Sequence, residues 1–273
     1  MTIGIVGAKG RSHRLPGKNL RAFHGTPLFM WSVIQLLNSR RVDKVYVTTD
    51  DEEVAGIARE AKALAHMRHT EEALAPDASM HGPVFELLTD LLETNAASRS
   101  DRFIMALPTS PLRSPWDFDH ILERLEGADF VLPLCQLHET IIYDLSAADV
   151  TAPVIADKNF NFAIQGGGST GWRLGHYLDE LETYKGVAGG LTDSELDDRF
   201  MVGLHPPPAL AMPRGGLRRR FYLEPWQQWE IDDETGWNLC EIVMQHRILG
   251  PLGSDCYEAY AGGKEWEHRT VIS

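Results

Sequence analysis

Short apolar runs alternate with helical stripes of apolar residues over the first half of the chain. Four runs have the length and composition of buried strands: residues 3–7, 42–47, 103–107 and 130–134. Apolar residues recur with the i, i+3, i+4, i+7 spacing of a helix face over residues 28–37, 54–61, 84–91 and 118–125. This alternation predicts an α/β fold, in which helices cover both faces of a mixed, mainly parallel sheet. Ligands of such sheets bind beyond the carboxyl ends of the strands.

Polar residues predict where three of these helices begin. We expect Thr26 to cap the first helix, with Pro27 at its first position. Asp50 and Glu53 have the spacing of a capping box, with Asp in the place of Ser or Thr. Ser114, which precedes a proline, marks the third start.

The regular alternation stops in the middle of the chain. Glycine and proline clusters interrupt residues 136–213, and a helical stripe returns with Trp237, Cys240 and Met244. We therefore predict a core over residues 1–135, an inserted subdomain over 136–213, and a C-terminal return to the core over 214–273 that ends in a closing helix.

Composition narrows the class of protein. The chain has 273 residues and a formal net charge of −13, which argues against nucleic acid or an anionic membrane as a main partner. The apolar run at residues 3–8 is too short for a signal peptide and precedes its charges, and no stretch approaches a membrane span. Cys135, Cys240 and Cys256 show neither a disulfide framework nor paired metal-ligand spacing. We expect a soluble, cytoplasmic protein with buried thiols.

Residues 8–19 form a basic loop directly after the first predicted strand. Lys9, Arg11, Arg14 and Lys18 surround His13 and two glycines. Glycine lets backbone N–H groups approach phosphate oxygens while cations neutralise their charge, so the loop predicts a phosphate site. It matches neither a P-loop nor a dinucleotide fingerprint. A solvated basic turn is the alternative.

Two acidic residues near the C-terminal helix form a second candidate site. In an extended segment, Glu230 and Asp232 point the same way, and paired carboxylates suit Mg²⁺. The alternative is that Asp232 or Asp233 caps the following helix.

Four motifs in order resemble the acylneuraminate cytidylyltransferases, which make CMP-activated sialic and related nonulosonic acids. The basic loop resembles their A-R-x-x-S-K-x-(L/I)-P-x-K-N signature. The other matches are residues 20–28, the strand end at 47–51, and residues 107–113, which resemble Q-P-T-S-P-L-R. The resemblance covers residues 3–135 and resumes over 229–245, and it implies a three-layer, Rossmann-like nucleotidyltransferase fold whose inserted subdomain forms a dimer contact.

The resemblance implies roles for the nucleotide-side residues. Lys9 and Lys18 would hold the triphosphate of CTP. His13 occupies a position where the family usually has lysine. We predict that these three residues are catalytic. Arg68 resembles an arginine near the cytosine. Further nucleotide-binding positions are Ala8, Gly10, Ser12, Arg14, Asn19, Asp77 and Ser79. Mg²⁺ would bind Glu230 and Asp232, although the family has Asp at the first of these positions.

The acceptor side departs from the family. The resemblance places Leu107, Thr109, Ser110 and Arg113 at the acceptor, but sialic-acid enzymes have Gln where this chain has Leu107. Their polar sugar-binding segment has no counterpart between residues 140 and 213. Lys158, Arg173 and Lys185 are candidate contacts for the acceptor's acid group.

The resemblance therefore implies a Mg²⁺-dependent, homodimeric transferase that moves CMP from CTP to an acidic keto-sugar and releases pyrophosphate. Two alternatives remain: the acceptor is an octulosonate or a phosphonate, or the chain is a nucleotide-binding protein that has lost catalysis. A G-x-G-x-x-G spacing at residues 166–171 leaves an NAD-linked oxidoreductase as a rival from another class.

Overall fold

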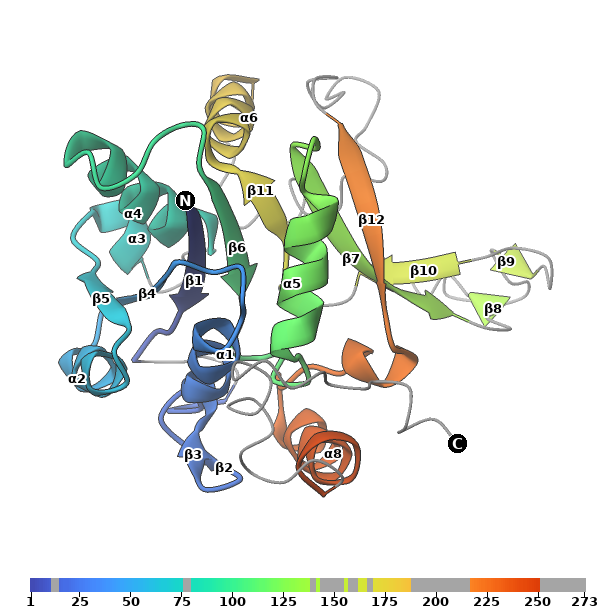
Figure 1. Cartoon of the computed structure of the whole chain (residues 1–273). Helices are drawn as coiled ribbons and strands as arrows, with labels where there is room; N and C mark the ends of the chain where they lie inside the picture. The colour runs from blue at the N-terminus through green and yellow to red at the C-terminus, as the bar shows by residue number, and fades with distance from the viewer. Residues whose placement is uncertain are drawn as a thin grey trace, which may run out of the picture.

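The computed structural model describes residues 1–10, 15–75, 80–137, 141–142, 155–156, 162–165, 169–187 and 217–250. Eight strands form the main sheet (Figure 1). In chain order they are β1 (Thr2–Gly7), β4 (Lys44–Thr49), β5 (Leu64–Met67), β6 (Arg102–Ala106), β7 (Phe130–Leu137), β10 (Phe162–Gln165), β11 (Gly171–Arg173) and β12 (Arg218–Leu223).

The sheet is mixed and mainly parallel, as predicted. Its order runs β5-β4-β1-β6-β11-β7, and the first four of these strands are parallel to one another. The short strand β11 is antiparallel to both β6 and β7. Since β12 pairs along β7 in parallel, β10 and β11 follow one another along the other edge of β7.

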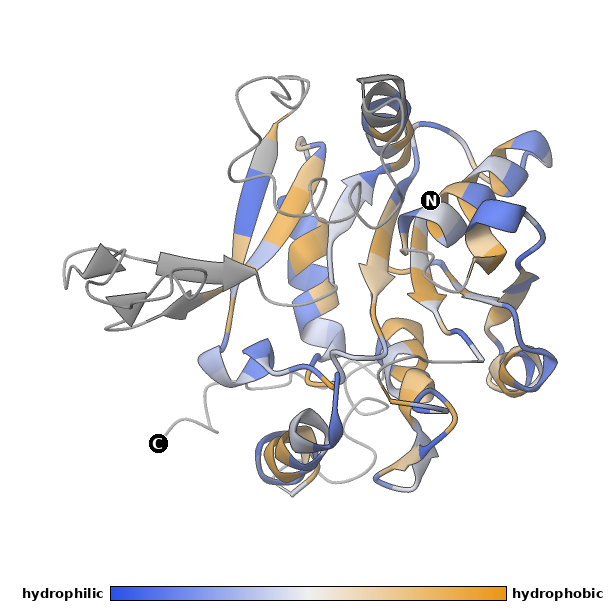
Figure 2. Ribbon diagram, turned by 180° about the vertical axis from the view of Figure 1, so that it is seen from behind, coloured by the Kyte–Doolittle hydropathy of each residue, from blue (hydrophilic) through white to orange (hydrophobic). Residues whose placement is uncertain are grey.

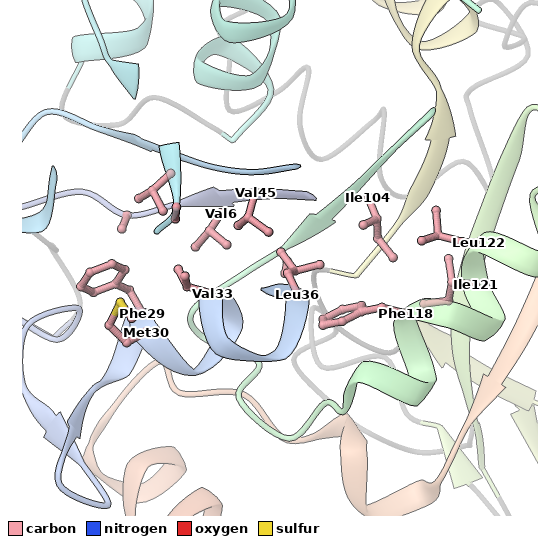
Figure 3. Packing of buried hydrophobic residues seen from close by; sticks show 14 of the residues in the cluster. Val6, Phe29, Met30, Val33, Leu36, Val45, Ile104, Phe118, Ile121 and Leu122 are labelled. Atoms are coloured by element: carbon pink, nitrogen blue, oxygen red, sulfur yellow. The ribbon is translucent and has the colours of Figure 1, made fainter. Parts of the chain in front are cut away.

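Helices cover both faces of the sheet and produce the expected three layers. On one face, α1 (Leu28–Leu37), α2 (Glu52–Glu60) and α5 (Pro115–Arg124) pack on the strands; Figure 3 shows Val33 near Val6, and Phe118 near Leu36 and Ile104. On the other face lie α4 (His81–Glu93) and α6 (Leu174–Val187). Hydrophobic residues gather on the strands and on the helix faces turned towards them (Figure 2). Each fully buried aliphatic side chain contributes about 1.5–3 kcal/mol.

Two of the three predicted helix starts are wrong, and the third is confirmed. Asp51, not Asp50, caps α2, since its carboxylate accepts the N–H groups of Glu53 and Val54. The predicted Thr26 cap is absent: the residue before α1 is Pro27, and Thr26–Pro27 forms strand β3, paired with β2 (Ala22–Phe23). Ser114 caps α5 at the predicted start, and it forms a capping box with Asp117.

Part of the predicted inserted segment belongs to the core. Strand β11 lies between β6 and β7, and Trp172, Leu174 and Tyr177 are buried against the sheet. A small ribbon, β8 (Ile141–Ile142) with β9 (Ile155–Ala156), forms separately. The remaining residues of the segment lie outside those described, so its subdomain and dimer roles stay predictions. Gly171 begins β11, which is antiparallel to both of its neighbours, whereas dinucleotide binding requires a parallel βαβ unit. The glycines at 166–168 lie outside the described residues.

The C-terminal part packs across the end of the sheet. Helix α8 (Glu234–Met244) buries Trp237, Cys240 and Met244, as its stripe predicts, against Phe23, Leu28 and Trp31. Cys135 and Cys240 are buried free thiols. None of the helices in the described ranges has the length and apolarity to cross a membrane.

Candidate active site

The candidate residues meet at the carboxyl ends of the central strands. Strands β1, β4 and β6 are parallel, so the loops after Gly7, Thr49 and Ala106 leave the sheet at one edge. In Figure 1 the arrowheads of β1 and β6 point towards the end of the molecule where α8 lies. The segment before α8 returns to this edge, where the Ile231 N–H donates to the Thr109 carbonyl at 2.8 Å.

Lys18 lies at the centre of this edge. Only 9% of the residue is exposed, and its Nζ donates to the Ile231 carbonyl at 2.9 Å and lies 3.8 Å from Asp232 Oδ1. Gly17, at φ +67°, lets the chain turn immediately before it. The turn therefore directs a charged amine towards the acidic segment.

The start of the basic loop is held by backbone contacts. Asn19 Nδ2 donates to the Lys9 carbonyl at 2.8 Å, and the buried Ala8 N–H donates to the Thr48 carbonyl at 3.1 Å. The Gly10 N–H donates to Asp50 Oδ1 at 2.8 Å. A Cβ at Gly10 would lie 2.3 Å from Asp51 Oδ2, so a side chain here would displace the cap of α2.

Glu230 and Asp232 form the acidic side of the site. Ser110 Oγ donates to Glu230 Oε1 at 3.2 Å. Burial raises the pKa of Glu230; Arg113, the Ser110 hydroxyl and Lys18 act against this, and the Asp232 charge adds to it. Asp233 caps α8 by accepting the Gly236 N–H at 2.7 Å. Capping therefore accounts for Asp233, whereas Asp232 lies beside Lys18.

The donor set fits Mg²⁺. Both side chains offer carboxylate oxygens, which this ion prefers together with phosphates and water. A cation would also offset the burial and mutual repulsion that raise the pKa of Glu230.

Arg113 lies in the interior beneath the acidic segment. It is 1% exposed and donates to the carbonyls of Gln227, at 2.6 Å, and Leu112, at 3.3 Å. Burial lowers its pKa, although the charges of Asp117 and Glu230 favour the guanidinium. We predicted that Arg113 contacts the acceptor, but these contacts instead position the turn of Pro225–Gln228 that leads to Glu230.

The other predicted acceptor residues make mostly backbone hydrogen bonds in this structure. The Leu107 carbonyl accepts the Ser32 hydroxyl at 3.2 Å and the Ser110 N–H at 3.0 Å. Thr109 binds Ile231 through its carbonyl, and both Leu107 and Thr109 are half-buried. Arg173 pairs in register with Arg102, the first residue of β6, and binds Asp129 at 3.1 Å. It therefore lies at the opposite edge of the sheet, away from this site.

Arg68 flanks the other side of the basic loop. It is buried, and its Nη2 donates to the Thr48 carbonyl at 3.1 Å. Its Nε has no hydrogen-bond partner within the described ranges. Burial lowers the pKa of Arg68, and the charges of Asp50 and Glu86 oppose this effect.

Five predicted nucleotide-side residues lie outside the described residues: Ser12, His13, Arg14, Asp77 and Ser79. The same holds for Lys158 and the Lys185 side chain. Sequence reasoning missed Asp50, Asp51 and Gln227 as supports of the site. The only signal for them was their place beside a strand end or a motif.

Comparisons with known proteins find sequence similarity over the first half of the chain. Residues 3–126 match the cytidylyltransferase family. A CMP-N,N'-diacetyllegionaminic acid synthase of Legionella pneumophila is 27% identical over 121 residues, which are 44% of this chain and 51% of the relative. A pseudaminic acid cytidylyltransferase of Campylobacter jejuni is 43% identical over 54 residues, which are 20% of this chain and 23% of the relative. The chain thus matches about half or less of these relatives' lengths.

Solved structures share the fold over most of the chain. A CMP:2-keto-3-deoxy-manno-octonic acid synthetase in complex with CTP superposes with a TM-score of 0.63 at 16% identity, covering 90% of this chain and 99% of its own. A 4-diphosphocytidyl-2C-methyl-D-erythritol synthase from Anaerococcus prevotii gives 0.61 at 11% identity, with 89% and 98% covered. With four ordered motifs and this match, residues 3–126 of the chain are similar in sequence to the cytidylyltransferase family, and the chain shares the fold of the solved nucleotidyltransferases.

Proposed function

We propose that this chain transfers CMP from CTP to an acidic keto-sugar and releases pyrophosphate. The observation that carries the proposal is the approach of Lys18 to Asp232, beside Glu230, at the carboxyl ends of β1 and β6. A cationic loop and paired carboxylates at one sheet edge suit a triphosphate with its counter-ion. Relatives named for legionaminic and pseudaminic acids support the acceptor class.

The reaction needs positioning and charge neutralisation more than covalent chemistry. A hydroxyl oxygen of the acceptor attacks the α-phosphorus as the bond to the β-phosphate oxygen breaks and pyrophosphate leaves. Lys9 and Lys18 would neutralise the phosphates, with His13 beside them in the loop. Glu230 and Asp232 would hold Mg²⁺, which when bound neutralises phosphate charge. Arg113 would act through Gln227 to keep the carboxylates in place.

The remaining nucleotide contacts follow the family motifs. Ala8, Gly10, Ser12, Arg14 and Asn19 would surround the triphosphate. Arg68 would lie near the base, with Asp77 and Ser79 closing over it. Leu107, Thr109 and Ser110 would face the acceptor. An octulosonate or phosphonate acceptor is the second candidate, because Leu107 removes the amide with which sialic-acid enzymes contact their sugar.

Thermal-shift measurements with each of the four nucleoside triphosphates and Mg²⁺ test the nucleotide half. Pyrophosphate release with a panel of nonulosonates, octulosonates and phosphonates tests the transfer. We expect CTP alone to stabilise the protein and one acceptor class to release pyrophosphate. CTP binding without release on any acceptor would identify a protein that has lost catalysis. Stabilisation by NAD(H) instead would overturn the proposal.

Two further properties belong to this proposal. We expect a cytoplasmic enzyme, because CTP is its donor, and a homodimer formed through residues 136–213. Light scattering coupled to size-exclusion chromatography tests the dimer. A monomer at micromolar concentration would contradict it.

A further inference from the structure

A second cluster of ligand-type side chains is formed by the sequence neighbours of Arg68 and by helix α4. His66 ends β5 together with Met67, His69 follows Arg68, and Asp90 projects from α4. The Nε2 atoms of His66 and His69 each lie 2.9 Å from Asp90 Oδ2. Within the described ranges, these three residues offer ligand atoms that all lie within 4.8 Å of one another.

The atoms are of the kind that transition metals select. Two imidazole nitrogens and one carboxylate oxygen favour Zn²⁺ and its neighbours over Mg²⁺ or Ca²⁺. Zinc holds His nitrogen at about 2.0–2.1 Å and carboxylate oxygen at about 2.0–2.2 Å. Two ring nitrogens that already converge on one oxygen need only small side-chain rotations to surround an ion. Three protein ligands leave the fourth tetrahedral position to water.

The surroundings support a cation. Glu86 lies one turn before Asp90 on α4, and its side chain is 3% exposed. Its carboxylate accepts the backbone N–H groups of His69, at 3.1 Å, and Thr70, at 2.6 Å, and it lies 3.8 Å from His66 Nε2. Two carboxylates thus lie beside two imidazoles, and imidazoles bind a metal in their neutral form, so a bound cation would meet a net negative set of ligands and neighbours.

Outer contacts already orient the ligands. The second nitrogen of His66, Nδ1, lies 3.4 Å from the Thr48 hydroxyl, leaving Nε2 directed at the cluster. Such contacts fix ring orientation and tautomer at metal sites. The side chains of His69 and Asp90 are 58% and 33% exposed, so an ion could enter from solvent.

We propose that His66, His69 and Asp90 form a Zn²⁺-type site, separate from the carboxylates at 230 and 232, that fastens the segment after β5 to α4. His66 and His69 flank Arg68 in sequence, and Arg68 is bound to Thr48 at the end of β4. An ion in the cluster would therefore fix the backbone on both sides of this buried arginine. Binding of the ion does not depend on the proposed transferase activity.

Co²⁺ titration of the chelator-treated full chain tests the site, because its visible absorption reports both binding and geometry. We expect one equivalent to give a tetrahedral spectrum that Zn²⁺ abolishes by competition. His69→Ala and Asp90→Asn should each weaken Co²⁺ binding at least tenfold to a hundredfold, since even outer-shell losses have this effect. Both positions are partly exposed, so both variants should stay folded, which circular dichroism checks.

His120→Ala is the matched control. His120 is also partly exposed and pairs with a carboxylate, Glu123, at 2.9 Å on α5. Its variant should bind Co²⁺ like the parent. Absence of a tetrahedral Co²⁺ species at micromolar metal, or equal binding by the parent, His69→Ala and Asp90→Asn, would show a hydrogen-bonded cluster only and overturn the proposal. The titration contains no nucleotide, so its failure and failure of CTP binding are separate results.

Discussion

Lys18 Nζ donates to the Ile231 carbonyl at 2.9 Å, although 213 positions separate the two residues. This bond joins the basic loop after β1 to the acidic segment before α8. It holds a nearly buried ammonium group within 3.8 Å of Asp232. This contact between distant parts of the chain thus helps to place the cation beside the carboxylates.

Replacing Lys18 should impair the proposed reaction strongly. Lys18→Ala would remove the proposed charged phosphate contact, which should cost about 1.5–3 kcal/mol, or about tenfold to a hundredfold in CTP affinity. Isothermal titration with CTP measures the loss. Lys44→Ala, at an exposed strand start, should bind like the parent. Unchanged CTP affinity in Lys18→Ala would remove the phosphate role from this residue.

Substitutions at the neighbouring residues Asp232 and Asp233 should distinguish metal binding from helix capping. Asp232→Ala should raise the Mg²⁺ concentration needed for half-maximal activity and change stability little. Asp233→Ala removes the cap of α8 and should cost about 0.5–2 kcal/mol of unfolding free energy. Urea unfolding and Mg²⁺ titrations on both variants check this. The same Mg²⁺ requirement in the two variants would exclude Asp232 as a ligand.

The buried thiols should resist alkylation in the folded protein. Burial, with a further contribution from Glu230, raises the pKa of Cys240 to about 12, and burial also raises the pKa of Cys135. Because the thiolate is the nucleophile, both should stay unmodified by iodoacetamide at pH 8 and react after unfolding in urea. Peptide mass spectrometry assigns the labelled positions. Rapid labelling of native Cys240 would show that α8 opens.

Asp129 should stabilise the fold in a pH-dependent way. Burial alone would raise its pKa, but the Leu217 N–H at 2.9 Å and Arg173 at 3.1 Å, among other contacts, make the net change a decrease. The stabilisation is therefore full above the unfolded pKa of about 3.9 and is lost as the pH falls through the folded value. Asp129→Asn should cost about 1 kcal/mol at pH 7 and less at pH 3. A difference that grows on acidification would contradict this assignment.

N-acetylneuraminate should be a poor acceptor. Leu107 cannot hydrogen-bond a sugar, and a site built on hydrogen bonds rejects mismatched analogues by about 10⁴-fold, far more than an apolar pocket does. Steady-state kinetics on N-acetylneuraminate, other nonulosonates, octulosonates and small phosphonates rank the acceptors. If N-acetylneuraminate gave the highest kcat/KM of the set, a sialic-acid acceptor would be established.

Sequence predicts this fold where the signal is local. The apolar stripe and Ser114 were enough for α5, because its cap lies three residues from Asp117. The choice of Asp51 over Asp50 for α2 was not predictable, since Asp50 is engaged by Gly10 from a distant loop. Strand β11 has only three residues and no usable periodicity. Arg113 illustrates the limit at the site: its motif is clear, but its burial depends on Gln227 from the C-terminal part.

The place of β11 also constrains how the chain acquires its structure during synthesis. Strand β11 lies between β6 and β7 and pairs with both. The edge of β6 and the edge of β7 that face β11 therefore stay unpaired until residues 171–173 have been synthesised. A nascent chain that ends near residue 135 would expose two unsatisfied strand edges, which are templates for association with other chains. Such distant pairings also slow folding. We expect chains truncated after the first half to aggregate, and the sheet to be completed late in synthesis.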